Sequence, residues 1–267
     1  MLKLLRVESE MVKAIAGSEP GTLLKGLKIL QVLGDNPRGV RFSELAETAE
    51  LANSTAHRIL GLLVDRGFVE YDQQSRLYTL GLKLLELSQK VNAIVGVAEV
   101  ARPVMRDLAD RSGMLVSLDV LDGVNIVVVE RVDPPTRIRI GGELGMRQPI
   151  HSTSAGKSML ATLPASERKT LLAGLVLTRQ TRNTLVDPAA FTAEIAEAER
   201  RGFAIGNEEN EEGVRSIAVA IPTRQGRRRA ALSLAAPSFL TDGETMIKHL
   251  PALQAAAKDI SARLGSL

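Results

Sequence analysis

The chain of 267 residues contains no cysteine. Disulfide bonds, cysteine-ligated metal centres and thiol catalysis are therefore excluded. The sequence also lacks any apolar run long enough to cross a bilayer. Its first 21 residues mix charged with apolar side chains, so they do not form the uninterrupted apolar core of a signal peptide. We therefore expect a cytoplasmic protein.

A strong excess of charge of either sign is absent as well. The formal net charge is +3, and charged residues make up 24% of the chain beside 45% hydrophobic residues. That balance is typical of a globular protein, and the length accommodates one large domain or two ordinary ones. Because no global basic field favours nucleic acid, any affinity for DNA must come from locally placed charges.

The stretch from residue 41 to residue 80 predicts two short helices followed by two β-prone segments. The first helix is expected to be capped by Ser43 and the second by Asn53, because both residue types accept hydrogen bonds from free helix amides. Phe68–Tyr71 and Leu77–Leu80 then predict a β-hairpin. This order of elements is that of a helix-turn-helix followed by a wing.

The second of these helices has one apolar and one polar face. Its apolar residues recur at the spacing of a buried stripe, namely Ala56, Ile59, Leu60 and Leu63. Ser54, Arg58 and Gly61 fall on the opposite face, as in a helix that reads the major groove. Arg58 is the principal candidate for base contact, since its guanidinium matches the two acceptors of guanine. A solvated ion pair of Arg58 with Asp65 or Glu70 is the alternative.

Further candidates for DNA contact surround this helix. The amides and hydroxyls at its N-terminus favour phosphate groups. Arg41 precedes the motif, and Arg76 lies at the tip of the expected wing. His57 either touches DNA or packs within the domain. The predicted DNA-binding residues are thus Arg41, Ser43, Asn53, Ser54, Thr55, His57, Arg58 and Arg76.

Segments on both sides of the motif complete the N-terminal half. Residues 1–21 form an N-terminal extension, either a short amphipathic helix or a disordered end. A helix from Thr22 to Gly34 follows, with an inward face formed by Leu23, Leu27, Leu30 and Leu33. Residues 81–96 predict one connecting helix, so the chain divides into a domain at 22–80 and a second domain at 97–267.

The second domain mixes hairpins with helices, which favours an antiparallel α+β fold over a parallel doubly wound sheet. Hairpins are expected around residues 122–123 and 225–226, with a further strand at Arg137–Ile140. Helices are expected at 102–111, 154–163, 166–174, 188–201 and 241–264. The second hairpin turn is basic and is either solvated or a second contact with DNA or an acidic surface, through Arg224, Arg227, Arg228 and Arg229.

The segment IHSTSAGKS at residues 150–158 is similar to two enzyme motifs but completes neither. Its G-K-S ending is typical of a phosphate-binding loop, but His151 stands where the first glycine belongs. Ser154 to Lys157 fits the S-x-x-K of serine β-lactam enzymes, whose S-D-N and K-T-G partners are absent. What remains is a helix N-terminus with small side chains, which suits a carboxylate or carbonyl group.

Four segments together resemble the isocitrate lyase regulator (IclR) family of bacterial transcription factors. They are LLKGLKILQVL, LANSTAHRILGLLVDRGFVE, IHSTSAGKSMLATLP and GFAIGNEENEEGVRSIAVAIPTRQGRRRAALSLAAP, in this order over nearly the whole chain. The resemblance implies an N-terminal winged helix-turn-helix joined by a helix to a C-terminal GAF-like ligand-sensing domain. The implied partners are a double-stranded DNA operator and a small-molecule effector. The resemblance also implies that copies of the chain form dimers, which often pair into tetramers, and that the protein does not bind a membrane.

The resemblance also implies an effector pocket between the helix that starts near residue 154 and the strands of Ser216 and Ser233. The candidates for effector contact, the first three as an apolar wall, are Leu144, Met146, Ile150, His151, Ala155, Gly156, Ser216, Ser233 and Ala235. Each of them is also readable as an ordinary core or turn residue. Relatives that bind small oxo-acids carry a cysteine in place of Ser216, an acidic residue near Gly206 and a serine near Ala235. The loss of polar partners favours a larger or more apolar acid, including aromatic acids.

These features predict a ligand-responsive transcription factor whose recognition helices enter successive major grooves of a pseudo-palindromic operator. Two alternatives stay open. One is an enzyme that uses the C-terminal pocket, although no nucleophile–base pair emerges from the sequence. The other is a winged-helix module that binds only proteins. Neither a metal nor a cofactor is expected, because His57, His151 and His249 lack the spacing of metal ligands.

Overall fold

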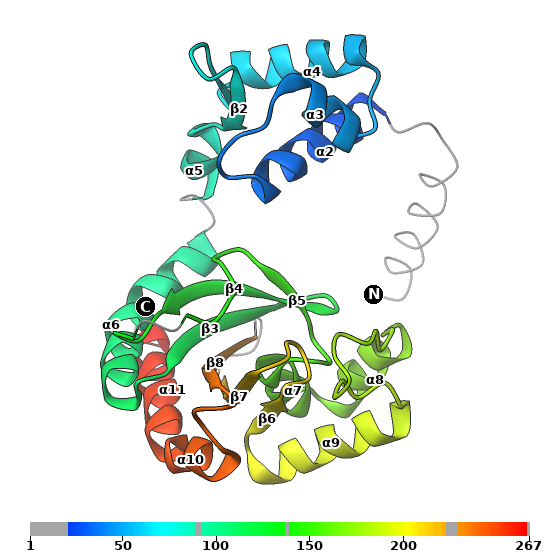
Figure 1. Ribbon diagram of the computed structural model, residues 1–267. Coiled ribbons are helices and arrows are strands. Elements are labelled where there is room, and N and C mark those ends of the chain that lie inside the picture. The colour runs from blue at the N-terminus through cyan, green and yellow to red at the C-terminus, as the bar shows by residue number, and fades with distance from the viewer. Residues whose placement is uncertain (1–20, 89–91, 137–138, 223–228, 266–267) are drawn as a thin grey trace. The chain divides into compact units, whose positions relative to one another are not determined.

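The computed structural model describes residues 21–88, 92–136, 139–222 and 229–265, in two compact units (Figure 1). The division between the units falls between Val91 and Asn92. We refer to the parts on either side as the N-terminal unit and the C-terminal unit. Within the described ranges, no helix combines the length and apolarity that a bilayer crossing would need.

The N-terminal unit is a winged helix-turn-helix, as the sequence predicts. Its elements are α2 (Thr22–Asp35), α3 (Phe42–Thr48), α4 (Asn53–Asp65), the antiparallel hairpin of β1 (Val69–Asp72) and β2 (Leu77–Leu80), and α5 (Lys83–Ser88). Val40 adds a bridge to Tyr78 of the wing, with an N–O distance of 3.0 Å. The core lies where the three helices meet the wing and consists of Ile29, Leu33, Val40, Leu45, Ala49, Ile59, Leu60 and Val69.

The inward face predicted for the first helix is partly wrong. In α2 the side chains of Leu23 and Leu27 are 78% and 47% exposed, whereas Ile29 and Leu33 are buried. Leu27 lies six positions from Leu33, which places it about 120° away around the helix. Ile29, four positions before Leu33, shares its face. The buried stripe therefore continues through Ile29 rather than through Leu27 and Leu23.

The predicted helix caps are also wrong by one or two residues. The N-cap position is Arg41 for α3 and Ala52 for α4, each with an extended backbone, and neither helix has a side-chain cap. Ser43 and Asn53 lie inside the first turns instead. The first amides of an exposed helix end need no side-chain cap, because they are accessible to solvent. The side chains at the start of α4 consequently make no cap hydrogen bond.

The C-terminal unit contains one six-stranded sheet with the order β5-β4-β3-β8-β7-β6, and every neighbouring pair is antiparallel. This confirms the predicted antiparallel α+β class. The strands are β3 (Leu115–Asp122), β4 (Asn125–Val132), β5 (Arg147–Pro149), β6 (Ala204–Asn207), β7 (Val214–Ile221) and β8 (Ala230–Pro237).

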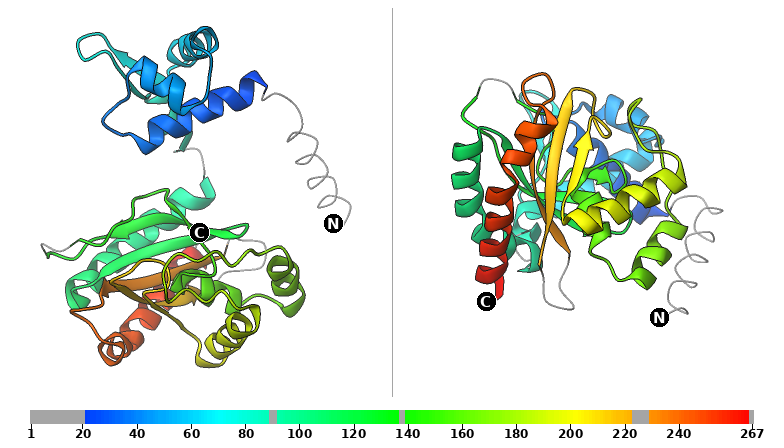
Figure 2. Two further views of the ribbon diagram at one scale, coloured as in Figure 1. Left: turned by 45° about the vertical axis from the view of Figure 1, so that its right-hand side comes forward. Right: turned by 90° about the horizontal axis from the view of Figure 1, so that it is seen from below.

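Helices cover both faces of this sheet (Figure 2, right). One face carries α6 (Asn92–Ser112) and α11 (Leu250–Gly265), with the short α10 (Gly243–Lys248) beside them. The other face carries α7 (Ser154–Ala161) and α9 (Pro188–Arg201), and α8 (Ala165–Ala173) lies between them in the chain. The sheet therefore separates two hydrophobic cores.

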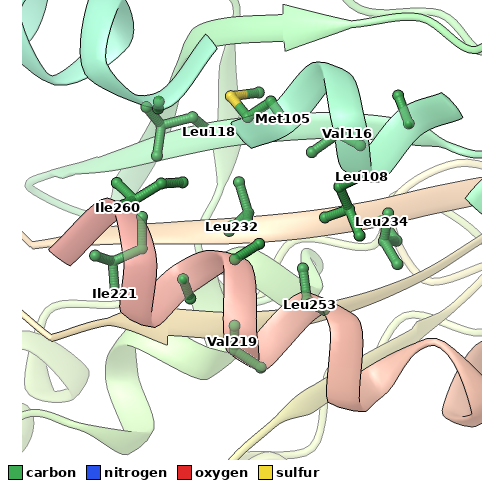
Figure 3. Packing of buried hydrophobic residues seen from close by; sticks show 14 of the residues in the cluster. Met105, Leu108, Val116, Leu118, Val219, Ile221, Leu232, Leu234, Leu253 and Ile260 are labelled. Carbon is green, nitrogen blue, oxygen red and sulfur yellow. The ribbon is translucent and has the colours of Figure 1, made fainter. Parts of the chain in front are cut away.

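Alternation along β3 distributes its side chains between these two cores. Val116 and Leu118 pack with Met105 of α6 and Ile260 of α11 on one side (Figure 3). Their neighbours in sequence, Leu115, Ser117 and Asp119, point to the side of α7. The core on that side is formed mainly by Ile126, Ile150, Met159, Leu160, Phe191 and Ile195.

Several boundaries in the C-terminal half differ from the prediction. The expected single helix at 241–264 is two helices, because Pro251 has no amide to continue the hydrogen bonding of α10. The segment 81–96 contains α5 and the start of α6, which continues to Ser112 and includes the separate helix expected at 102–111. A strand was not expected at β6.

Other expectations fall partly or wholly outside the described residues. Residues 1–20, the turn at 225–226 and three of the arginines around it (Arg224, Arg227 and Arg228) lie outside the described ranges. For the strand expected at 137–140, only Arg139 and Ile140 are described, and they form no strand. The edge strand on that side of the sheet is β5 instead.

Candidate DNA-binding surface and effector pocket

The α4 helix presents a polar face opposite its buried stripe. Ala56, Ile59 and Leu60 are at most 3% exposed, and Leu63 packs partly buried against the same core. Ser54, Arg58 and Gly61, on the predicted outer face, are all exposed. The 3.6-residue period fixes this arrangement, because burying the stripe turns the other face to solvent.

The Arg58 guanidinium is not held in an ion pair among the described residues. Its Nη2 donates to the Thr22 hydroxyl over 3.5 Å. Asp65, which the sequence offered as a partner, instead lies 3.4 Å from Arg66. The forked donors of Arg58 are therefore available to acceptors on another molecule.

The other predicted DNA-binding residues lie mostly on the surface. Arg41, Ser43, Asn53 and His57 are exposed, and Thr55 is half-buried. The His57 ring also packs edge-on against Phe42, with 5.8 Å between ring centroids. Arg76, at the tip of the wing, is exposed and has a positive φ of 59°. This conformation belongs to the tight turn that Asp72 closes by accepting hydrogen bonds from Gln74 and Ser75.

A pocket lies in the C-terminal unit between the start of α7 and the sheet. Its empty volume is about 680 Å³, including space open to solvent. Four of the predicted effector residues line it, namely Ala155, Ser216, Ser233 and Ala235. Leu115, Ile126 and Val128 supply apolar walls. Apolar walls with a few convergent polar groups are typical of a site for a small organic molecule.

At the end of the pocket next to α7, small side chains bring the backbone close. The Ser154 hydroxyl donates to the Ser216 hydroxyl over 2.8 Å. A Cβ added to Gly206 would lie 2.5 Å from the Ser216 oxygen and 3.5 Å from the Ser154 amide nitrogen. The Gly156 amide donates to the Thr153 hydroxyl over 3.2 Å, whereas the amides of Ser154 and Ala155 precede the hydrogen-bond ladder of α7, so this end of the pocket suits an anionic group.

The remaining predicted effector residues do not line this pocket. Leu144 and Met146 are 59% and 44% exposed, so they form no apolar wall. Ile150 is fully buried in the core beneath α7, and Gly156 packs against its backbone. His151 is buried, with its Nε2 2.8 Å from the Thr178 carbonyl oxygen. Packing of α7 on the preceding turn keeps these three residues out of the lining of the cavity.

Lys157, the lysine of the G-K-S ending, points into the protein interior. Its side chain is 1% exposed, and its Nζ lies 2.6 Å from Oε1 of Glu209. A second carboxylate, that of Glu194, lies 3.6 Å away. A lysine bound in this way cannot reach a phosphate, in agreement with the missing first glycine of the motif.

Comparison with known proteins identifies both units. Residues 89–262 match the family model described as the C-terminal domain of the bacterial transcriptional regulator IclR, and residues 22–73 match the IclR helix-turn-helix domain. The chain belongs to the IclR family. A curated member, the HTH-type transcriptional regulator KdgR of Escherichia coli, is 32% identical over 91% of this chain and 92% of its own length. The protein is accordingly a DNA-binding transcriptional regulator with a C-terminal effector domain.

Solved structures of IclR-family proteins have the same fold. The Thermotoga maritima IclR aligns with a TM-score of 0.77 at 31% identity, covering 92% of this chain and all of the other. An IclR homologue from Microbacterium hydrocarbonoxydans, complexed with 4-hydroxybenzoate, aligns with a TM-score of 0.80 at 26% identity, with coverage of 92% and 100%. The alignment with this ligand-bound homologue thus spans nearly the whole of both chains.

The sequence reasoning missed the polar residues at the far end of this IclR-family pocket. Ser117 and Asp119 line it, and Asp119 is 2% exposed. Burial raises the pKa of the Asp119 carboxyl to about 7, while hydrogen bonds from Ser117 and Ser233 lower it in part. Their signal was present in the sequence, because two polar residues at alternate positions interrupt the apolar strand LVSLDVLD.

Arg131 also lines the pocket and was not singled out. Its guanidinium donates to the carbonyl oxygens of Ile140 and Gly141, at 2.6 and 2.8 Å. It also pairs with Asp133 over 2.6 Å. These bonds hold the irregular segment at 139–142 against β4 and leave the Arg131 charge already compensated.

Proposed function

We propose that this IclR-family regulator binds a pseudo-palindromic double-stranded operator in the cytoplasm as a dimer or a dimer of dimers. The observation that carries the proposal is the exposed donor face of α4, opposite a stripe that is almost completely buried. The operator-binding domain would be residues 22–80. Two α4 helices related by the symmetry of a dimer would enter successive major grooves.

In this proposal the contacts to DNA divide into two kinds. Arg58 reads a guanine edge through its two parallel donors. Asn53, Ser54 and Thr55, together with Arg41, Ser43, His57 and Arg76, position the domain on phosphate and sugar groups. The unpaired state of Arg58 among the described residues supports the first role. The absence of a side-chain cap at the start of α4 supports the second.

Arg58→Ala is expected to weaken specific operator binding by about 1–3 kcal/mol and to relax the preference at one base pair. The measurement is a gel-shift titration of the full-length chain against DNA from upstream of its own gene. Arg66→Ala is the matched control, since it removes the same charge from the far end of α4, where Arg66 already pairs with Asp65. Equal operator affinity of Arg58→Ala and the wild type would remove Arg58 from the interface.

The same DNA separates this function from the two alternatives. A fluorescence-anisotropy titration is expected to show binding that is sequence-selective and falls steeply with salt. A winged-helix module that serves only protein contacts would show neither property. An enzyme would need a nucleophile beside a base in the pocket. We propose instead that the pocket senses an effector, in agreement with the curated relatives, which are named as transcriptional regulators.

The proposed effector is a small organic acid, bound in the domain at residues 97–267. The amides at the start of α7 would receive its carboxylate. The apolar walls, and the non-polar Gly206 and Ala235 on either side of Ser216 in the strand ladders, favour an aromatic acid over a small oxo-acid. Effector binding would alter operator affinity through the connector at 81–96. The effector would do so by binding one of two arrangements of the protein more tightly than the other, which shifts the equilibrium between them.

A further inference from the structure

Three oxygen atoms from two neighbouring strands form a hydrogen-bonded wall at one end of the effector pocket. The Ser117 hydroxyl lies 2.9 Å from Oδ2 of Asp119 and 2.7 Å from the Ser233 hydroxyl. The Ser233 hydroxyl lies 3.5 Å from the same carboxyl oxygen. We call Ser117, Asp119 and Ser233 the acid–serine wall. All three line the pocket, so the wall faces whatever the pocket binds.

The acid–serine wall contains no cation. Opposite Asp119 in the strand ladders lie the uncharged Val128 of β4 and Ala231 of β8, and α7 contributes Ser154 and Ala155 to the pocket. The charged groups that share the lining are Arg131, Glu209 and Glu211. Arg131 is engaged by Asp133 and by backbone carbonyls, and Glu209 pairs with Lys157. Asp119 therefore has no basic partner among the described residues.

The two polar ends of the pocket are separated by a distance that matches a single substituted ring. Ser216, beside the start of α7, lies on β7, and Ser117 lies on β3, with β8 between these strands. On β8, Ser216 is opposite Ala235 and Ser117 is opposite Ser233, so the two serines are also two residues apart along the strands. Two strand spacings and two residues of rise together amount to roughly 12 Å. A carboxylate at the α7 end and a second polar group on the opposite side of a ring would reach both ends.

We propose that Asp119 is a specificity-determining residue that, as a neutral acid, reads a hydroxyl group on a monocarboxylate effector and excludes a second negative charge. The inference rests on the proposed effector-sensing function. A neutral carboxyl both donates and accepts hydrogen bonds, so with the two serines it satisfies a ligand hydroxyl completely. An ionised Asp119 would repel an anionic ligand in this buried setting, so binding of the anion favours the protonated carboxyl.

The sign of the pH dependence follows from that coupling. Asp119 is protonated below its pKa of about 7, so the protein is competent to bind the anion there. As the pH rises through that value, the competent fraction falls. If only the protonated form binds, the affinity drops about tenfold between pH 6 and pH 8, because each pH unit above the pKa reduces the competent fraction tenfold.

The test is isothermal titration calorimetry of the full-length chain with three probes, 4-hydroxybenzoate, benzoate and terephthalate. We expect 4-hydroxybenzoate to bind at least about tenfold more tightly than benzoate, since benzoate leaves the buried wall without its partner. Terephthalate, with two carboxylates, is expected not to bind. The affinity for 4-hydroxybenzoate is expected to fall about tenfold between pH 6 and pH 8.

Two variants test the residue itself. Asp119→Asn keeps a donor and an acceptor without a titrating proton, so it is expected to prefer 4-hydroxybenzoate but to lose the pH dependence. Asp119→Leu is expected to bind benzoate and 4-hydroxybenzoate equally. If circular dichroism shows that Asp119→Leu does not fold, the pH profile of Asp119→Asn decides. Equal binding of the two benzoates by the wild type, no binding of either, or an unchanged pH profile in Asp119→Asn overturns the proposal.

A further variant separates this inference from the proposed function. Ala235→Leu adds volume to the pocket opposite Ser216, without changing a residue of the acid–serine wall, and is expected to reduce binding of both benzoates. If it reduces binding while the Asp119 variants behave as the wild type does, only the role of Asp119 is lost. If probes bind and Ala235→Leu leaves them unaffected, the pocket is not the effector site, and the sensing function proposed for it fails.

Discussion

Lys157→Met is expected to lower the free energy of unfolding of the C-terminal unit by about 3–5 kcal/mol. The lysine side chain is 1% exposed, and its ammonium lies 2.6 Å from Glu209 and 3.6 Å from Glu194. Methionine fills a similar volume but carries no charge. The substitution therefore leaves the Glu209 carboxylate, 9% exposed, without the cation that compensates its burial.

The expected loss is large because the Glu209 carboxylate has little else to bind. Its Oε1 also accepts a weak hydrogen bond from the backbone N–H of Asn207 over 3.3 Å. Its Oε2 is buried without a partner among the described residues. The Glu209 carbonyl accepts bonds from the hydroxyls of Thr181 and Thr184, which fix the loop in place. These bonds hold the Glu209 backbone, so the carboxylate can move toward solvent only by rotation of its own side chain.

Urea denaturation followed by far-UV circular dichroism measures this loss. Both tyrosines, Tyr71 and Tyr78, lie in the N-terminal unit, so tyrosine fluorescence follows that unit separately. Arg263→Met is the control, because its pair with Asp259 on the surface of α11 is about half exposed and is screened by solvent. The double variant Lys157→Met/Glu209→Leu is expected to regain most of the stability. A double variant no more stable than Lys157→Met would contradict this account.

The period of apolar residues made the DNA-binding unit predictable. The stripe of Ala56, Ile59 and Leu60 fixed which face of α4 is buried, and hence that Arg58 is exposed. Local signals were less informative about where helices begin. Arg41 and Ala52 hold the cap positions although neither side chain caps, because the backbone of the turn rather than side-chain chemistry starts these helices.

The pocket was predictable only where the family resemblance supplied it. The resemblance placed Ser216 and Ser233 in the pocket, and the structure brings both to it. It also placed His151 and Gly156 there, but tertiary packing turns both into the core. The partners that decide the chemistry are far apart in sequence. Ser117 and Ser233 are separated by 116 residues, and Lys157 and Glu209 by 52. No local period or cap carries information about such pairs.

Gly156 illustrates how a glycine in an apparent binding motif can be a packing residue. A Cβ on Gly156 would lie 2.1 Å from the Ile150 carbonyl oxygen and 2.7 Å from its carbonyl carbon. Both atoms belong to the backbone, so no side-chain rotation relieves the clash. The start of α7 must therefore move away from the preceding turn, and this same helix end forms one end of the pocket proposed for the effector.

Gly156→Ala is accordingly expected to destabilise the C-terminal unit by about 3 kcal/mol. In a helix without such a clash, the same substitution would instead stabilise the protein by up to about 1 kcal/mol. Gly174→Ala is the matched control in the same unit, since no atom lies within 4 Å of its added Cβ and its φ of −103° suits any residue. Urea denaturation followed by circular dichroism should show a loss for Gly156→Ala alone. If Gly156→Ala were as stable as Gly174→Ala, α7 would not be held against the Ile150 turn. The helix end would then be adjustable, and the fixed spacing between its amides and the acid–serine wall could not select effectors by length.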